Sequence, residues 1–100
     1  MKTKSAKAKG RKLQDWVRRV MLDGFPSSEH EDIRCAIMGE KGADIKITGK
    51  AKAYYPWSIE CKNQEMFKTI YKYYRQAEAH GEGEPVLFIK MNGEKPLAVV

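Results

Sequence analysis

Apolar residues recur along the chain with two different periods, which separate the expected helices from the expected strands. The first helical pattern begins at Arg11 and ends at Gly24, where a glycine followed by Pro26 stops a helix. Its apolar stripe repeats every three or four residues and consists of Leu13, Trp16, Val17, Val20 and Met21. A second helix is predicted from Glu65 to His80, and its apolar face consists of Met66, Phe67, Ile70, Tyr71, Tyr74 and Ala77. Each helix thus has one face to bury against a sheet.

Alternation of apolar and polar residues with a period of two predicts the strands. They are expected at residues 33–38, 42–48, 57–62, 86–89 and 97–100, with one helical turn at 51–55. Residues 86–89 are apolar on both faces, which is typical of a central strand, and Asn92-Gly93 indicates a hairpin. A helix between two neighbouring strands implies a parallel crossover. The pattern predicts an α/β fold, a mixed central sheet flanked by helices, in a single domain spanning residues 10–100.

Two consecutive strands carry charged residues on one face. Glu60 and Lys62 share a face with Ser58, whereas the opposite face carries Trp57, Ile59 and Cys61. If the preceding strand pairs with this one as in a hairpin, Asp44 lies beside Glu60. Two carboxylates and a lysine are a costly structural cluster, but carboxylate oxygens suit Mg²⁺ or Mn²⁺. The alternative is an ion pair between Glu60 and Lys62 on an edge strand that faces water.

The arrangement Asp44…Glu60-Cys61-Lys62 resembles the PD-(D/E)xK nuclease signature. The runs 38–44 and 59–64 are similar to small phage-type and Holliday-junction-resolvase-like members of that superfamily. The resemblance implies a restriction-endonuclease-like αβββαβ core and a Mg²⁺-dependent endodeoxyribonuclease, with Mn²⁺ as a substitute, that nicks DNA or cleaves it structure-selectively. It also implies that Asp44, Glu60 and the backbone carbonyl of Cys61 bind the metal, while Lys62 orients or deprotonates the attacking water.

Many resolvase-like members carry a Lys-Gly-x-x-x-Glu run on the first helix. Here the run from Lys9 has the same spacing but ends in Gln14, which can hydrogen-bond a water beside the metal without adding charge. Gln14 is therefore a candidate catalytic residue, a strong second metal site is not expected, and a helix-surface role is the alternative. Gln64 and Gln76 are candidates for contacts to phosphate or to the site, and each can instead be structural.

The charge distribution indicates a class of partner. The net charge is +6, and six basic residues precede the first acid, which leaves the rest of the chain neutral. A flexible basic arm at residues 1–9 on a neutral body favours a polyanion, most simply DNA, although a merely solvated tail is the alternative. The nucleic-acid-binding candidates are Lys7, Lys9, Arg11, Lys12, Gln64 and Lys90.

Other features narrow the function classes. No apolar run is long enough to span a membrane and no apolar signal segment follows the basic start, so no membrane partner and a cytoplasmic location are expected. Cys35 and Cys61 lie on apolar strand faces and are predicted to be reduced thiols; together with His30 and His80 they lack the spacing of a zinc site. A homodimer would let two sites address two strands. The alternative function is a non-catalytic DNA-binding protein that retains the nuclease fold.

Overall fold

The fold is given by a computed structural model that describes residues 2–25, 30–64 and 69–100, with side chains described from Lys7 onward. The elements in chain order are α1 (Lys2–Gly24), the 3₁₀ turn η1 (His30–Asp32), β1 (Ile33–Cys35), β2 (Ile45–Ile47), α2 (Gly49–Tyr54), β3 (Trp57–Gln64), α3 (Ile70–His80), β4 (Glu84–Met91) and β5 (Leu97–Val99). The predicted order of helix, three strands, helix and two strands is confirmed, and α2 is the predicted helical turn.

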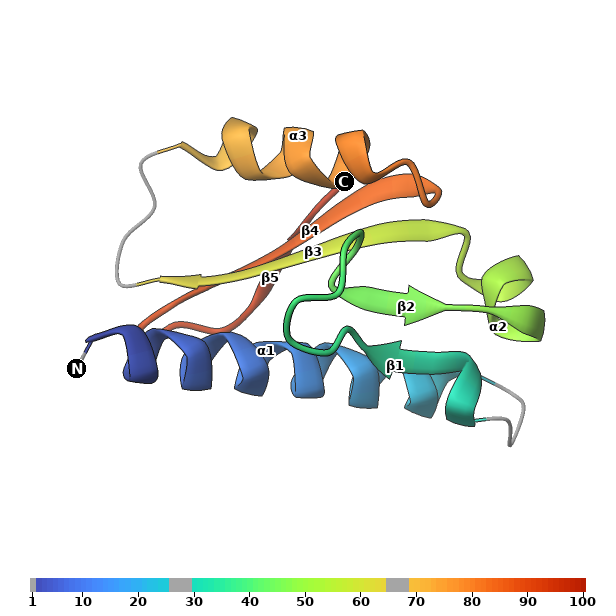
Figure 1. The fold of residues 1–100 in the computed structure, drawn as a ribbon, viewed down its shortest axis with the longest axis horizontal. Coiled ribbons are helices and arrows are strands. Elements are labelled where there is room, and N and C mark those ends of the chain that lie inside the picture. The colour runs from blue at the N-terminus through green and yellow to red at the C-terminus, as the bar shows by residue number, and fades with distance from the viewer. Residues whose placement is uncertain (1, 26–29, 65–68) are drawn as a thin grey trace.

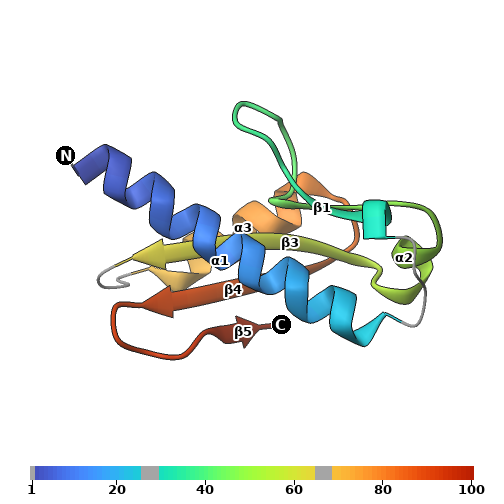
Figure 2. The same ribbon diagram turned by 90° about the horizontal axis from the view of Figure 1, so that it is seen from below.

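The five strands form one mixed sheet in the order β1-β2-β3-β4-β5. Strands β3 and β4 are parallel and are connected through α3, as the crossover argument predicts, while the other neighbours are antiparallel. Helices α1 and α3 lie on opposite faces of the sheet, which forms the middle layer (Figure 1). Seen from below, α1 crosses the sheet and α3 lies behind it (Figure 2). The predicted α/β class, a mixed sheet flanked by helices, is confirmed.

The main hydrophobic core lies between α1 and the sheet. It is built from Leu13, Val17 and Met21 of α1, from Phe25, Ala51 and Cys61, and from Ile33, Ile45, Ile47, Ile59 and Val86 of the sheet. Trp16 packs at its margin, but Val20 is 46% exposed, contrary to the predicted stripe. Val20 follows Trp16 by about one helical turn, and Trp16 is itself only partly buried, so this side of α1 lies at the margin of the core.

Both long helices begin at other residues than predicted in the described part of the chain. Helix α1 begins at Lys2 and not at Arg11, so residues 2–9, expected as a flexible arm, continue the helix. Lysine and alanine favour helix, and a single glycine, Gly10, does not outweigh them. Helix α3 begins at Ile70, after a non-helical Thr69; the predicted start at Glu65 and the residues Met66 and Phe67 lie outside the described residues.

The buried face of α3 also differs from the predicted one. Ile70 and Tyr71 are exposed, whereas Ala77 is fully buried and Tyr73 and Gln76 are half-buried. The Ser58 hydroxyl donates to the Ala77 carbonyl at 2.8 Å, so α3 turns a partly polar face toward β3. An apolar pattern alone does not reveal a face that docks on polar side chains.

The cysteines and aromatic residues of the core behave as structural groups. Cys35 and Cys61 are free thiols, as predicted. Burial, with the charge of Asp15 as the next cause, raises the pKa of Cys35 to about 11, and burial raises the pKa of Cys61. Phe25, Tyr54, Tyr55 and Trp57 contact one another near α2 through tilted and edge-to-face ring pairs. The helices that the structure describes include none with the length and apolar character needed to cross a membrane.

Candidate functional site

One face of β3 carries a row of polar side chains toward α3. This row consists of Ser58, Glu60, Lys62 and Gln64, which alternate with the residues that face the α1 core. At its far end the Gln64 amide donates to the Tyr73 hydroxyl at 2.8 Å, and the Lys62 Nζ lies 5.1 Å from the centre of the Tyr73 ring. The row is therefore held against α3 at both ends, by Tyr73 at the Gln64 end and by the hydrogen bond to the Ala77 carbonyl at the Ser58 end.

Asp44 joins this row from the neighbouring strand. Ile45 pairs with Ile59, and the Asp44 N–H donates to the Ile59 carbonyl at 2.9 Å. The Cys61 N–H in turn donates to Asp44 Oδ2 at 2.8 Å, which orients the carboxylate. The N–H and C=O of one strand residue leave the strand on the same side, so the Cys61 carbonyl also faces the edge on which Asp44 lies. The predicted pairing of the two acid-bearing strands is confirmed.

The turn before Asp44 is fixed by Glu82. The Ala43 N–H donates to Glu82 Oε2 at 2.8 Å, and Lys46 Nζ lies 3.2 Å from the same oxygen. Gly42 adopts φ +96°, and a Cβ there would collide with both of these side chains. A glycine is thus required where the chain enters β2. The Glu82 and Lys46 side chains pack closely against this glycine, two residues before Asp44.

Glu60 is the buried charge of the site. It is only 5% exposed, and its Oε2 lies 3.6 Å from Lys62 Nζ. Its Oε1 lies 3.4 Å from His80 Nε2, but no hydrogen bond reaches this buried oxygen from any described residue. A buried carboxylate normally has its oxygens hydrogen-bonded. Apart from the His80 imidazole at 3.4 Å, this Glu60 oxygen has no partner among the described residues, so it can accept a further one.

Both carboxylates of the site have raised pKa values. Burial is the main cause for Glu60, and the neighbouring charge of Asp44 adds to it, against the lowering effect of Lys62 and His80. Burial also raises the pKa of Asp44, opposed first by the Cys61 hydrogen bond and then by Lys62. The charge of Asp44 disfavours ionisation of Glu60, and a bound cation would relieve this repulsion.

His80 belongs to this cluster, although sequence reasoning considered it only as a zinc ligand. It is the last residue of α3, and its imidazole contacts the Glu60 oxygen that does not contact Lys62, with part of the His80 side chain exposed. The available signal was its spacing: His80 follows Gln76 by four residues and the buried Ala77 by three. Those intervals place it on the face of α3 that docks on β3.

The remaining candidates do not gather at Glu60. Gln14 is half-buried on α1, whose core residues pack on the opposite face of β3, and no hydrogen bond of its side chain appears among the described residues. Gln76 lies on α3 with a buried Oε1 that has no hydrogen bond from any described residue. Lys7 and Arg11 are exposed on α1. Three of the predicted nucleic-acid-binding residues, Lys9, Lys12 and Lys90, line a pocket between α1 and β4.

The donor set at this site suits a hard cation. Oxygen donors come from Asp44, Glu60 and the edge-facing carbonyl of Cys61. The Glu60 oxygen that accepts no hydrogen bond from any described residue is the observation that favours a ligand. No cluster of three or more His, Cys, Asp or Glu side chains able to hold a metal is found in the described part of the chain. Mg²⁺ typically uses only one or two carboxylates and takes its other ligands from water and phosphate. Two carboxylates are therefore sufficient for Mg²⁺, and the site does not fit a cation that needs a full protein cage.

The chain was compared with protein-family models, with curated proteins and with solved structures. No protein-family model matches the chain, and neither the curated proteins nor the solved structures include a significant match.

The buried carboxylate leads to a first prediction, on stability. Because the pKa of Glu60 is raised in the folded state, its ionised form destabilises the fold at neutral pH. Glu60→Gln should therefore raise the melting temperature of the metal-free protein at pH 7, where each kcal/mol corresponds to about 4–8 °C for a domain of this size. The gain should disappear as the pH falls below the unfolded-state pKa, about 4.3, where the wild-type carboxyl is protonated in both states. Thermal melts in EDTA at pH 4 and 7 test this, and an equal change at both pH values would contradict it.

Proposed function

We propose that the protein is a Mg²⁺-dependent endodeoxyribonuclease with a restriction-endonuclease-like core, which nicks DNA or cleaves it structure-selectively. The observation that carries the proposal is the buried Glu60, one oxygen of which accepts no hydrogen bond from any described residue, beside a second carboxylate and a lysine. A buried charge of this kind lowers stability, and such arrangements concentrate at functional sites. The resemblance of Asp44…Glu60-Cys61-Lys62 to the PD-(D/E)xK signature supports the same reaction class.

Each residue then has a chemical role. Asp44, Glu60 and the Cys61 carbonyl would hold the cation, and the Cys61 N–H keeps the Asp44 carboxylate in position. Bound Mg²⁺ would supply a Lewis acid that neutralises phosphate charge and makes water a better nucleophile. Lys62, whose Nζ is 3.6 Å from Glu60, places a positive charge where the phosphate and the attacking water would lie.

Cleavage of supercoiled plasmid tests the proposal directly. Nicked or linear product should form with Mg²⁺ or Mn²⁺ and should be absent in EDTA. The control for a contaminating nuclease is the Asp44→Asn variant, purified in the same way. In addition, Mg²⁺ should raise the melting temperature of the wild type but not that of Glu60→Gln, because a ligand stabilises only a fold that binds it. An intact plasmid together with no Mg²⁺-dependent shift would refute the assignment.

His80 gives a second prediction, on metal dependence. Its imidazole lies 3.4 Å from Glu60 Oε1 and helps to set the position of that carboxylate. Residues that orient metal ligands typically contribute a factor of about 10–100 in metal affinity or activity. His80→Ala should therefore raise the Mg²⁺ concentration needed for half-maximal cleavage by about tenfold or more, whereas the rate at saturating Mg²⁺ falls less. Glu78→Ala, an exposed neighbour on α3, is the control; an unchanged Mg²⁺ titration for His80→Ala would exclude this positioning role.

A non-catalytic DNA-binding protein is the second candidate, and one observation favours it. The basic pocket between α1 and β4 needs no metal to bind a polyanion. Such a protein would retard DNA in a gel equally well in EDTA and in Mg²⁺, would leave plasmid intact, and would be unaffected by Asp44→Asn.

A further inference from the structure

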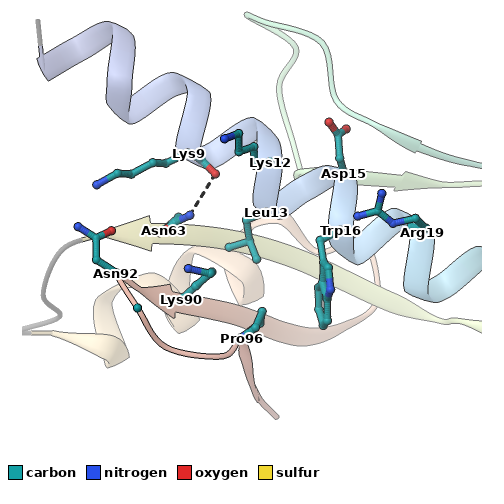
Figure 3. A pocket seen from close by; sticks show the side chains of 11 residues that line it. Lys9, Lys12, Leu13, Asp15, Trp16, Arg19, Asn63, Lys90, Asn92 and Pro96 are labelled. Carbon is teal, nitrogen blue, oxygen red and sulfur yellow. Dashed lines mark hydrogen bonds between the residues drawn. The ribbon is translucent and has the colours of Figure 1, made fainter.

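A pocket with a cationic rim and an apolar floor lies on the face of the sheet opposite Glu60. It has a volume of about 730 Å³ and is enclosed by α1, the end of β3 and the turn between β4 and β5 (Figure 3). Lys9, Lys12, Arg19 and Lys90 contribute four positive charges, and Asp15 contributes one negative charge. The volume lies in the range of pockets that hold a small organic group. The excess of positive charge selects an anionic ligand.

The floor of the pocket is suited to a flat aromatic group. Trp16 extends from α1 toward Pro96, and Leu13 projects from the same helix beside it (Figure 3). Trp16 packs on the core along part of its surface and is only partly buried, so the rest of its ring faces the pocket. Nucleobases stack on tryptophan without regard to sequence, because every base has a π-face.

A polar atom that accepts no hydrogen bond from any described residue belongs to a side chain that lines this pocket. The Asn63 amide nitrogen donates to the Lys9 carbonyl at 3.2 Å, but its Oδ1 is buried with no hydrogen bond from any described residue. Asn63 lines the pocket next to Lys90, its partner in the parallel pairing of β3 and β4. A carbonyl oxygen can only accept a hydrogen bond, and every base offers an N–H donor on its edge. A ligand that matches this pocket has a flat ring, a negative charge and an N–H donor. A nucleotide has all three.

We infer that this pocket binds an unpaired nucleotide of a single DNA strand, with its base on Trp16 and its flanking phosphates against Lys12 and Lys90. The inference rests on the DNA partner proposed above and deepens it by naming the strand form. A base inside a duplex has both of its faces covered by stacking, so it cannot lie on Trp16. Asn63 and Lys62 are neighbours in β3 and face opposite sides of the sheet. A strand held here would therefore be anchored on the side of the sheet opposite the carboxylates.

The test measures binding in EDTA, so that it does not depend on cleavage. The probe is a fluorescein-labelled twelve-residue oligothymidylate, compared with a blunt hairpin duplex and with ATP. Lys12→Ala/Lys90→Ala should weaken oligothymidylate binding and reduce the log–log salt slope by about 1.4 units, since each single-strand phosphate contact contributes about 0.7. The matched control, Lys72→Ala/Arg75→Ala, removes two exposed cations from α3 on the other layer and should leave the slope unchanged.

Stacking has its own readout. In a Trp57→Phe background, Trp16 is the sole tryptophan, and oligothymidylate should quench its emission. Trp16→Leu, which keeps apolar contact with the core, should weaken binding by about fivefold or more. If Trp16→Leu does not fold, the double variant Lys12→Ala/Lys90→Ala still tests the pocket. Equal losses in the control pair, tighter binding of the hairpin, or ATP quenching Trp16 at the same concentration as the oligonucleotide would each overturn the inference. Loss of plasmid cleavage in Asp44→Asn with intact oligonucleotide binding would separate this pocket from the proposed catalytic site.

Discussion

Glu60→Gln, Asp44→Asn and Lys62→Ala should each lower the rate of plasmid cleavage by about a hundredfold or more. The three side chains converge on one face of the sheet, and Glu60 and Lys62 lie 3.6 Å apart. The amide variants keep the shape of each carboxyl but remove its charge, so a cation loses a ligand while the packing is conserved. The measurement is the initial rate of nicking of supercoiled plasmid at saturating Mg²⁺.

Two controls make this result specific. Glu94→Gln removes an exposed carboxylate in the β4–β5 turn, and Lys72→Ala removes an exposed ammonium from α3. Both should cleave at the wild-type rate, and far-ultraviolet circular dichroism should show that all variants are folded. Full activity in any two of the three site variants would refute the catalytic assignment of Asp44, Glu60 and Lys62.

The convergence of these three residues could be predicted because it depends on strand geometry alone. The period of two forces Glu60 and Lys62 onto one face, and antiparallel pairing of the next strand brings Asp44 to the same face. The hydrophobic alternation also determines which face is buried against α1, since a shift of one residue would turn Ile59 toward α3 and Lys62 into the core beside α1. The strand part of the site is therefore encoded locally.

The helical part of the site could not be predicted in the same way. The rotation of α3 depends on which of its faces docks on β3, and that face includes the polar contacts of Ala77 and Tyr73. An apolar count instead favoured Ile70 and Tyr71, which are exposed. His80 reaches Glu60 only because the helix docks in this rotation. The Trp16 pocket was missed for a related reason, because it forms where α1, β3 and the last hairpin meet, far apart in sequence.

Leu87→Ala should cause a large loss of stability. Leu87 is fully buried in β4 and is paired in register with Glu60, so both side chains lie on the α3 face of the sheet. Truncation of a buried leucine costs about 2–5 kcal/mol through lost burial and the cavity that remains. For a domain of this size that corresponds to a fall in melting temperature on the order of 10–30 °C, measured by thermal melts in EDTA at pH 7.

The same substitution also tests whether dryness around Glu60 raises its pKa. A cavity beside Glu60 admits water, which solvates the carboxylate and removes the main cause of the raised pKa. In the Leu87→Ala background, Glu60→Gln should therefore raise the melting temperature by less than it does in the wild type. Ile59→Ala is the matched control, because Ile59 is equally buried but faces α1. In that background the gain from Glu60→Gln should be unchanged, since the cavity lies on the other side of the sheet. Equal gains in both backgrounds would show that the desolvation of Glu60 does not depend on Leu87.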